Sequence, residues 1–491
     1  MLDGPGTYRA IRRFGVEQKG SIRPVDNCTE NGLNLVTGSR DKVTLIRPDS
    51  PARVCACYAR EQMEWQDELV RRGSWAAERG TAVRGVPDQY VHGNDDVKKA
   101  FRRIPNAAVG LMVVAVLNPR SLRAEFFVLP SFVFGSISAV MSWNRVPAAY
   151  THFARRLLAV PSTAYVDDFQ VGGPVYDQAS SQASQSIMLD IIGLGFDESK
   201  HEGGVSKSVN LGVESDFGMV NSASPVVLLG VTDERKRKLA VVVEEILCGG
   251  TISHAHALRL YGKARWTVCP VFGKIGLGVL HRLPSVTRTE SVGGDTLLGD
   301  DLRTLLRMLP MLRPVSFPLF PRRDAPLLVW TDASEDATLL GEIGVFIWCP
   351  ARRQAFAAGS RAPPCILAWL RSRQLKNKYI TQWELFAVLV AFLTFPVLFQ
   401  FRLVHHFVDN KGALGGLIKG YSDKPDSARI INMVHTQAVR YSCYPWFGFV
   451  YSEDNMADGP SRGDFSDVEK FQALVCPLVW PDLQALAGWS T

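Results

Sequence analysis

Tyr165-Val166-Asp167-Asp168 is followed at once by Phe169-Gln170-Val171-Gly172-Gly173, and this acidic segment is the most informative in the chain. An aromatic and a β-branched residue before the two carboxylates, and glycines after them, predict a tight hairpin with an acidic tip. Adjacent like charges are unfavourable unless something neutralises them, and in proteins a divalent cation commonly does so. The hairpin is therefore a candidate metal site, although a solvated turn rich in Asp would show the same pattern.

The composition describes a folded chain of several domains. With 491 residues it is too long for one ordinary core, and we expect about two to four domains. Apolar residues make up 46% and charged residues 21%, which is typical of a folded protein. The net charge of +7 would suit a polyanionic partner without establishing one.

Cysteine and apolar patterns bear on the compartment. The nine cysteines include no two pairs at zinc spacing, and an odd number argues against a disulfide framework, so we expect a reducing compartment. The N-terminal segment lacks the apolar core of a signal peptide. The longest apolar run, 385–399, is short for a membrane span and contains Thr394 and Pro396, so it predicts a buried core helix. We therefore expect an intracellular protein, cytoplasmic or nuclear, without a transmembrane segment.

A second acidic stretch precedes the hairpin, Asp95-Asp96-Val97-Lys98-Lys99-Ala100-Phe101. An Asp at the end of a strand could place a third carboxylate beside Asp167 and Asp168, which would complete a site for two metal ions. Phe101 would then lie under the sugar of an incoming nucleotide, where a bulky ring excludes a 2′-hydroxyl and selects deoxynucleotides. An amphipathic segment with a packing Phe explains this stretch equally well.

Two further positions are candidates for nucleotide binding. Arg23 lies in the predicted strand Ile22-Arg23-Pro24-Val25-Asp26, and a guanidinium there could bind a triphosphate with paired donors; an ordinary surface Arg is the alternative. Gly135 precedes a predicted helix of small residues and would let a base or nucleotide approach the backbone closely. A plain loop-to-helix junction is the alternative at Gly135.

A second set of carboxylates follows a proline-rich connection. The four acids are placed in this order: Asp332 after an apolar strand, Glu384 near the start of an apolar helix, Asp409 at the end of a strand, and Asp458 in the motif Asn455-Met456-Ala457-Asp458. Each motif is weak alone. Four of them in order on alternating strands and helices are strong evidence for the second resemblance described below.

The first half of the chain resembles the fingers and palm of a reverse transcriptase. The resemblance rests on four elements in order: Arg23, the stretch from Asp96 to Phe101, Phe134-Gly135, and Tyr165-Val166-Asp167-Asp168. This half of the chain is similar in particular to the polymerases of retrotransposons of the tyrosine-recombinase class. The resemblance implies these roles: Asp96, Asp167 and Asp168 as metal ligands, Phe101 as the steric gate, and Gly135 in the nucleotide pocket. The sequence departs from the family at Val133, where a proline is usual.

The resemblance also extends downstream. It implies that Lys200 lies near the leaving pyrophosphate as a general acid, with a free surface lysine as the alternative. The segments 209–213 and 228–231 both resemble the hairpin that holds the primer end, and the sequence does not separate them. The basic helices that begin near Arg235 resemble a thumb lying along a duplex backbone, with a solvated basic face as the alternative.

The second acidic set is similar to ribonuclease H, in which four carboxylates bind two Mg²⁺ ions that activate water against an RNA phosphodiester. The matching residues are Asp332, Glu384, Asp409 and Asp458. The histidine that is frequent in the last loop of that family has no counterpart here, and Tyr451-Ser452-Glu453 fills the region.

These resemblances predict an α+β right-hand polymerase of fingers, palm and thumb, followed by an α/β ribonuclease H-like domain with a mixed sheet. The predicted domains are fingers and palm over 1–225, thumb over 226–290, connection over 291–326, ribonuclease H-like domain over 327–465, and a C-terminal tail over 466–491. The expected activity is that of an RNA-directed DNA polymerase of a retroelement with hybrid-specific ribonuclease H activity.

The resemblance implies Mg²⁺ as cofactor, with Mn²⁺ as a substitute. The implied partners are RNA and DNA template-primer, RNA–DNA hybrid and deoxynucleoside triphosphates, without a membrane, and the sequence carries no signal for an oligomeric state. The alternative is a catalytically decayed or domesticated retroelement protein that binds nucleic acid. A cellular polymerase or telomerase-like enzyme would share the palm but would not be expected to have the second acidic domain.

Overall fold

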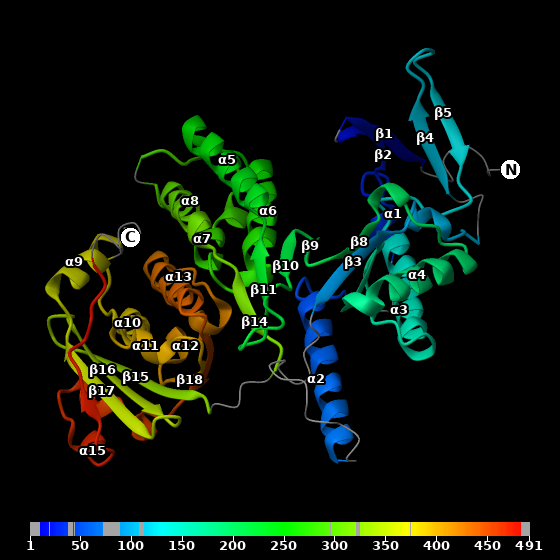
Figure 1. The fold of residues 1–491 in the computed structure, drawn as a ribbon. Coiled ribbons are helices and arrows are strands. Elements are labelled where there is room, and N and C mark those ends of the chain that lie inside the picture. The colour runs from blue at the N-terminus through cyan, green and yellow to red at the C-terminus, as the bar shows by residue number, and fades with distance from the viewer. Residues whose placement is uncertain are drawn as a thin grey trace. The chain divides into compact units, whose positions relative to one another are not determined.

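The computed structural model of the chain describes residues 10–18, 20–37, 43, 45–71, 89–107, 112–294, 296–320, 325–373 and 375–482. The fold is mixed α/β, and its sheets combine parallel and antiparallel strand pairs (Figure 1). The chain divides into two compact units. The first comprises Met1–Ser208, Ser215–Val227 and Pro318–Phe320, and the second comprises Val209–Glu214, Leu228–Phe317 and Pro321–Thr491.

An antiparallel sheet in the first unit contains both early acidic stretches. Its order is β6-β7-β3-β8, with strands β6 (Ser162–Tyr165), β7 (Asp168–Pro174), β3 (Tyr90–Asp96) and β8 (Glu202–Val205). The predicted hairpin is confirmed, because Tyr165 at the end of β6 pairs with Asp168 at the start of β7. Asp96, the last residue of β3, pairs with Asp168 from the other side. The strand register therefore brings the two stretches together.

Helices α3 (Ile137–Leu157) and α4 (Val175–Ile191) pack against this sheet. The buried core between α3 and the sheet includes Trp143, Tyr150 and Phe169, and the rings of Tyr150 and Phe169 are in edge-to-face contact. Two short 3₁₀ turns flank the acidic edge, η1 (Ala100–Arg103) after β3 and η3 (Glu198–Lys200) before β8. The buried rings fix the position of β7, and with it the acidic tip of the hairpin.

The rest of the first unit includes a second sheet of order β2-β1-β4-β5. Its elements and those beside it are β1 (Ile11–Gln18), β2 (Ser21–Asp26), β4 (Val113–Leu117), β5 (Ala124–Val128), α1 (Leu33–Val36) and α2 (Ser50–Arg71). β1 pairs in parallel with β4 and antiparallel with β2. This sheet places Arg23 and Asp26 on one strand.

A four-stranded sheet of order β14-β11-β10-β9 comes next in the chain. Its strands are β9 (Lys207–Asn210), β10 (Val213–Asp216), β11 (Val226–Val231) and β14 (Val315–Pro318). Leu211 and Gly212 turn the chain between β9 and β10 with φ of 52° and 77°. Of the two segments that resemble the primer-holding hairpin, 209–213 thus forms a hairpin, whereas 228–231 lies within one strand.

In the second unit, residues 233–311 form a group of helices that we call the helical segment. Its helices are α5 (Asp233–Gly249), α6 (His254–Phe272), α7 (Leu277–Leu280) and α8 (Leu297–Met308), with the short elements β12 (Thr251–Ile252), η4 (Leu283–Ser285), β13 (Glu290–Ser291) and η5 (Leu309–Met311). Buried apolar side chains such as Val243, Leu260 and Leu305 form its core.

Residues 325–482, which we call the C-terminal domain, form a six-stranded mixed sheet of order β19-β18-β15-β16-β17-β20. The strands are β15 (Leu327–Glu335), β16 (Gly341–Cys349), β17 (Gln354–Arg361), β18 (Leu403–Val408), β19 (Tyr444–Phe449) and β20 (Leu474–Val475). β15, β16 and β17 are antiparallel neighbours, whereas β18 is parallel to both β15 and β19.

The buried helix predicted from the apolar run 385–399 is confirmed for its first part as α10 (Ile380–Thr394), in which every side chain from Gln382 to Phe392 is buried. The run does not form one helix, because α10 ends before Pro396 and the last four residues form a separate short helix. α10 packs on β15 and β16 and against α13. The other helices of the domain are α9 (Pro364–Arg373), α11 (Pro396–Phe399), α12 (Lys411–Lys419), α13 (Pro425–Arg440), η6 (Ser452–Asp454), α14 (Asp458–Ser461) and α15 (Ser466–Glu469). Because α10 is buried on all sides, the side chains near its start, including Glu384, are held in fixed positions beside the sheet.

The C-terminal domain includes part of the segment predicted as a tail. α15 lies within 466–482, and β20 pairs in parallel with β17 at the edge of the sheet. Residues 483–491 lie outside the described residues.

Within the second unit, the helical segment packs against α13 of the C-terminal domain. The Arg429 guanidinium lies 3.6 Å from a carboxylate oxygen of Asp300 and donates to the Thr304 hydroxyl. The Gly276 amide donates to Asn432 Oδ1 at 2.8 Å. A Cβ atom at Gly278 would lie only 2.6 Å from the Ala428 carbonyl oxygen, so the backbones of α7 and α13 are in close contact there. The two parts therefore share a buried, partly polar interface.

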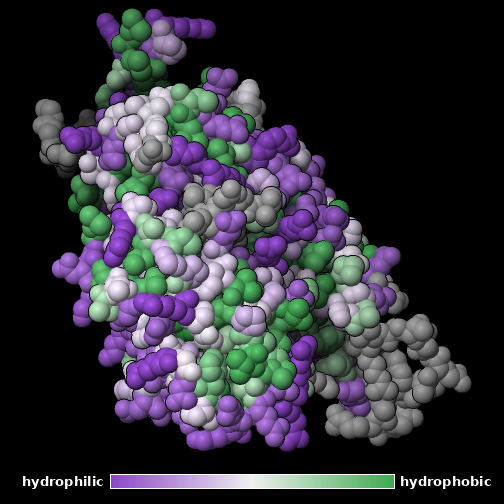
Figure 2. Space-filling model, turned by 90° about the vertical axis from the view of Figure 1, so that its left-hand side faces the viewer, coloured by the Kyte–Doolittle hydropathy of each residue, from purple (hydrophilic) through white to green (hydrophobic). Residues whose placement is uncertain are grey.

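The face of the molecule shown in Figure 2 mixes hydrophilic side chains with smaller hydrophobic patches. Among the described residues, no helix is both long enough and apolar enough to cross a membrane.

Two candidate metal centres

The first candidate site, which we call the N-terminal acidic site, consists of Asp96, Asp167 and Asp168. Hydrogen bonds to two main-chain carbonyls fix the hairpin that presents it: the Trp143 side chain donates from Nε1 to the Val166 carbonyl at 2.7 Å, and the Val97 amide donates to the Asp167 carbonyl at 2.9 Å. Val166 has a φ of 57°, a left-handed conformation that is uncommon for a β-branched residue. The buried indole thus stabilises a strained turn that presents two adjacent carboxylates.

The three carboxylates repel one another electrostatically. Burial, followed by the charges of Asp167 and Asp96, raises the pKa of Asp168 to about 6. Burial and Asp96 also raise the pKa of Asp167, although Lys200 and Arg23 act in the opposite direction. A divalent cation bound here would favour the charged carboxylates, because it would offset both their burial and their mutual repulsion.

Lys200 lies at this site, although its predicted role as a general acid stays a prediction. Its Nζ is 2.7 Å from Asp96 Oδ2. Burial lowers the pKa of Lys200, but the hydrogen bond and charge of Asp96 outweigh burial and raise it overall. The ammonium group therefore stays protonated beside the acids, as a proton donor or phosphate-binding group requires.

The structure places the other predicted nucleotide-site residues around the same sheet. Phe101 is half-buried in η1, with its ring centroid 5.7 Å from that of Phe134 and 6.5 Å from that of Trp143. Arg23 is exposed on β2 and close enough to lower the pKa of Asp167. Phe101 is thus held by aromatic packing, while Arg23 is available to a ligand.

Gly135 is required by its local geometry. Its φ is +105°, and a Cβ atom there would lie 2.4 Å from the Asp26 carbonyl oxygen. Asn34 bridges this junction, because its Nδ2 donates to the Gly135 carbonyl at 3.0 Å and its Oδ1 accepts from the Ile137 amide at 3.0 Å. Sequence reasoning missed Asn34, whose partners lie about a hundred residues away along the chain.

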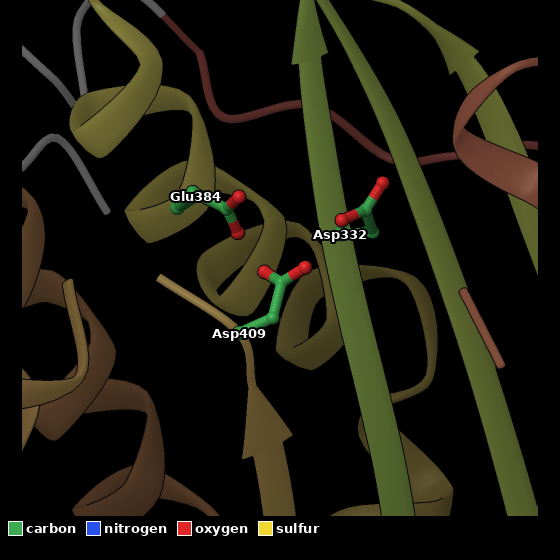
Figure 3. A group of neighbouring side chains, drawn as sticks. All are labelled: Asp332, Glu384 and Asp409. Carbon is green, nitrogen blue, oxygen red and sulfur yellow. The ribbon is translucent and has the colours of Figure 1, made fainter. Parts of the chain in front are cut away.

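The second candidate site, which we call the C-terminal acidic site, consists of Asp332, Glu384 and Asp409. Each of these residues offers a carboxylate oxygen, and the three oxygens lie within 4.8 Å of one another. Figure 3 shows the side chains converging from β15, from the first turns of α10 and from the end of β18. Three segments far apart in the sequence thus meet at one point beside the sheet.

This site suits a hard divalent cation. Asp332 and Glu384 are buried, and two buried oxygens, Glu384 Oε2 and Asp409 Oδ1, have no hydrogen-bond partner. Burial and the charges of Asp332 and Asp409 raise the pKa of Glu384 well above its ordinary value. Burial likewise raises the pKa of Asp332 to about 6, against a hydrogen bond from Ser461 that lowers it. Unpartnered, crowded carboxylate oxygens are the ligands that Mg²⁺ and Mn²⁺ prefer.

Asp458 stands apart from the other three predicted ligands. It is not in the group of oxygens within 4.8 Å, and its Oδ1 accepts from the Arg462 guanidinium at 2.8 Å. Its charge nevertheless raises the pKa of Asp332, so it is close to the site.

Uncharged donors orient the acids of the C-terminal acidic site. The Ser461 hydroxyl donates to Asp332 Oδ2 at 2.5 Å, and Asn455 Nδ2 lies 3.4 Å from Asp332 Oδ1. The Ser452 hydroxyl donates to Asp409 Oδ2 at 3.0 Å. Sequence reasoning did not assign these roles, although Asn455 and Ser452 lie in segments that it had singled out.

Comparisons with known proteins give structural neighbours only. The sequence matches no protein-family model. No curated protein is similar to it in sequence. Three solved structures similar to the chain are of a foamy viral protease-reverse transcriptase, and in each of them the match covers 90% of this chain. The dRH form in complex with ds DNA has 12% identity, a TM-score of 0.40 and 65% of its own length covered, and the complex with RNA/DNA hybrid has 12% identity, a TM-score of 0.42 and 50% of its length covered. The complex with dsDNA has 14% identity, a TM-score of 0.42 and 78% of its length covered. The chain thus spans less than two thirds of the first two. The function proposed below rests on the geometry of the two acidic sites.

Proposed function

We propose that this chain is an RNA-directed DNA polymerase of a retroelement that also has hybrid-specific ribonuclease H activity, both by two-Mg²⁺ phosphoryl transfer. Its partners would be RNA and DNA template-primer, RNA–DNA hybrid and deoxynucleoside triphosphates. The supporting observation is a pair of separate carboxylate sites on two sheets: Asp96 is paired in register with Asp168 in one, and three acids lie within 4.8 Å in the other. Mg²⁺ bound at such sites supplies activation of the attacking oxygen and neutralises charge on the phosphate.

At the N-terminal acidic site, the primer 3′-hydroxyl oxygen would bond to the α-phosphorus of the incoming nucleotide as the bond to pyrophosphate breaks. The hydroxyl proton passes to solvent, and Lys200 donates a proton to the leaving pyrophosphate. Arg23 would bind the triphosphate oxygens. Phe101, held by Phe134 and Trp143, would exclude a ribose 2′-hydroxyl, and Gly135 would leave space for the nucleotide.

At the C-terminal acidic site, a water oxygen would bond to the phosphorus of an RNA phosphodiester while the bond to the 3′-oxygen breaks. The water would lose a proton to solvent, and the leaving 3′-oxygen would take one from solvent to become a hydroxyl. Asp332, Glu384 and Asp409 would hold the cations. Asp458 would join them if it left Arg462, which would then be available to a phosphate.

The polymerase is tested by primer extension with an oligo-dT primer on a poly-rA template in Mg²⁺. We expect extension by the wild type and none by the Asp167→Asn/Asp168→Asn double variant. Asp190→Asn, which changes an exposed Asp on α4, is the matched control and should extend normally. Extension at the normal rate by the double variant would refute the assignment of the hairpin.

The nuclease is tested by hydrolysis of the RNA strand of a labelled RNA–DNA hybrid. Asp332→Asn should abolish hydrolysis, whereas Asp467→Asn, at an exposed position of the same domain, should not. Hydrolysis that survives Asp332→Asn would refute this assignment. Tight binding of the hybrid by the wild type without either reaction would instead favour the catalytically decayed or domesticated binding protein.

A further inference from the structure

Two consecutive aspartates at the end of β3 have different surroundings. Asp96 belongs to the N-terminal acidic site and pairs with Lys200. Side chains alternate between the two faces of a strand, so Asp95 points away from that site. Its carboxylate is fully buried, with a side-chain exposure of 0%. A buried carboxylate needs partners, because leaving one without them costs several kilocalories per mole.

Asp95 finds three such partners. His201 Nδ1 lies 2.6 Å from Asp95 Oδ1, and the side-chain amides of Gln182 and Gln185 donate to Asp95 Oδ2 at 3.1 and 3.2 Å. Gln185 is itself fixed, since its Oε1 accepts from the Ser162 hydroxyl at 2.5 Å. The carboxylate thus joins β3 to α4 and to the segment before β8.

The partners of the two aspartates are also consecutive in sequence. Lys200 and His201 lead into β8, which runs antiparallel to β3 with Glu202 opposite Asn94. Before β8 the chain leaves this register, because Glu198–Lys200 form η3 and the Asp197 amide donates to the Asp96 carbonyl at 2.9 Å. The Lys200 side chain itself is long and nearly half exposed, so its contact with Asp96 alone would hold it weakly.

We propose that Asp95 and His201 form a positioning pair, which fixes the segment before β8 and thereby holds the Lys200 ammonium group at the N-terminal acidic site. The inference deepens the proposed polymerase function and rests on it. Asp95 and His201 do not touch the reacting atoms. Their effect reaches the reaction through the placement of Lys200, whose neighbour His201 is tied to a buried carboxylate.

A double-mutant cycle tests this role in the full chain. His201→Ala should lower kcat for nucleotide addition about tenfold, the lower end of what loss of an outer partner of an active-site group costs, with KM for primer-template unchanged. In a Lys200→Ala background the same change should have no further effect on kcat. His201→Asn, whose amide can donate from near the position of Nδ1, should restore most of the rate. His152→Ala, at an exposed histidine on α3, is the matched control.

Equal losses of kcat with and without Lys200 would overturn the proposal, because His201 would then act independently of Lys200. An unchanged kcat in His201→Ala would do the same. A wild-type protein that fails to extend primers would count against the proposed polymerase function instead.

Amide hydrogen exchange tests whether His201 positions the segment before β8, and this measurement does not require enzyme activity. The amides of Lys200 and His201 donate to the carbonyls of Asp197 and Glu198 at 2.8 and 3.3 Å, so both report local opening of η3. In His201→Ala, a peptide covering 197–206 should exchange several-fold faster, while one covering β15 should be unchanged. Unchanged exchange in 197–206 would overturn the proposal. Asp95→Asn gives a second comparison, and the His201 variants decide the matter if this buried substitution prevents folding.

Discussion

The two acidic sites solve the same electrostatic problem differently. At the N-terminal acidic site a cation of the protein itself, Lys200, lies 2.7 Å from Asp96. At the C-terminal acidic site the hydrogen bonds to the acids come from uncharged groups such as Ser461 and Ser452, and two buried oxygens have no partner. The first site is therefore partly neutralised by a cation of the protein, whereas the second would depend more strongly on the proposed metal ions.

The largest difference should come from Glu384→Gln. The substitution keeps the size of the side chain but removes a metal ligand worth several kcal/mol, so hybrid hydrolysis should fall on the order of 10³-fold while primer extension is unchanged. In EDTA at pH 8 the variant should also be more stable by about 1–3 kcal/mol, because a buried oxygen without a partner is made neutral. Activity and denaturant unfolding measure the two effects. A less stable variant would contradict the comparison.

Ser461→Ala tests whether the uncharged donors orient the ligands. Loss of the hydroxyl that donates to Asp332 Oδ2 should weaken Mg²⁺ binding and hybrid hydrolysis by about 10–100-fold. Ser466→Ala, at the start of α15, is the control and should behave as the wild type. The Mg²⁺ dependence of hydrolysis is the measurement, and an unchanged dependence would show that the hydroxyl does not set the position of Asp332.

The pH dependence of Mg²⁺ binding should reflect both acidic sites. Asp168 and Asp332 each have a pKa raised to about 6. About nine-tenths of such a group is protonated at pH 5, so Mg²⁺ should bind about tenfold more weakly at pH 5 than at pH 8. For a carboxyl whose pKa is raised on folding, the stability contribution is present below the ordinary pKa near 4 and is lost as pH rises through 6.

Thermal unfolding with Mg²⁺ and with EDTA checks this expectation, since Mg²⁺ should raise Tm more at pH 8 than at pH 5. The rise in Tm caused by Mg²⁺ should thus differ between pH 8 and pH 5. Asp168→Asn should remove the part of this difference that comes from the N-terminal acidic site, and Asp332→Asn the part that comes from the C-terminal acidic site. A stabilisation by Mg²⁺ that is equal at both pH values would contradict the raised pKa values.

The smallest effect is expected from Lys200→Met. This substitution removes the cation from the N-terminal acidic site, so that its acids, like those of the C-terminal acidic site, have no ammonium group beside them among the described residues. Because the ammonium group is 46% exposed, loss of its ion pair should lower the stability of the metal-free protein at pH 8 by only about 0.5–1 kcal/mol. Mg²⁺ should then raise Tm more than it does in the wild type. Lys207→Met, at another exposed ion pair of the first unit, is the control.

The elements that sequence alone predicted were those with a local signal. The hairpin at Tyr165 to Asp168 follows from its apolar strands and glycines, and α10 follows from an apolar run of helical length. The order of motifs also indicated which acids belong together, and the structure brings Asp332, Glu384 and Asp409 into one group.

The interactions that sequence missed are contacts through space. Ser461 donates to a carboxylate 129 residues away, and His201 contacts one 106 residues away. Asp95 and Asp96 look interchangeable in the sequence, and only the pleat of β3 separates a buried structural acid from a site acid. The arrangement of Asp458 with Arg462 likewise follows from the turn at α14, which the motif does not encode by itself.

The interface between the helical segment and α13 bears on how the C-terminal domain could be isolated or exchanged. Arg429 is buried on the C-terminal domain, but its partners Asp300 and Thr304 are on α8. Cutting the chain after β14 would leave that guanidinium without Asp300 and expose the backbone contact between Gly278 and Ala428. The C-terminal domain is thus not independent of the helical segment, and exchanging it for another domain would require transplanting α7 and α8 with it.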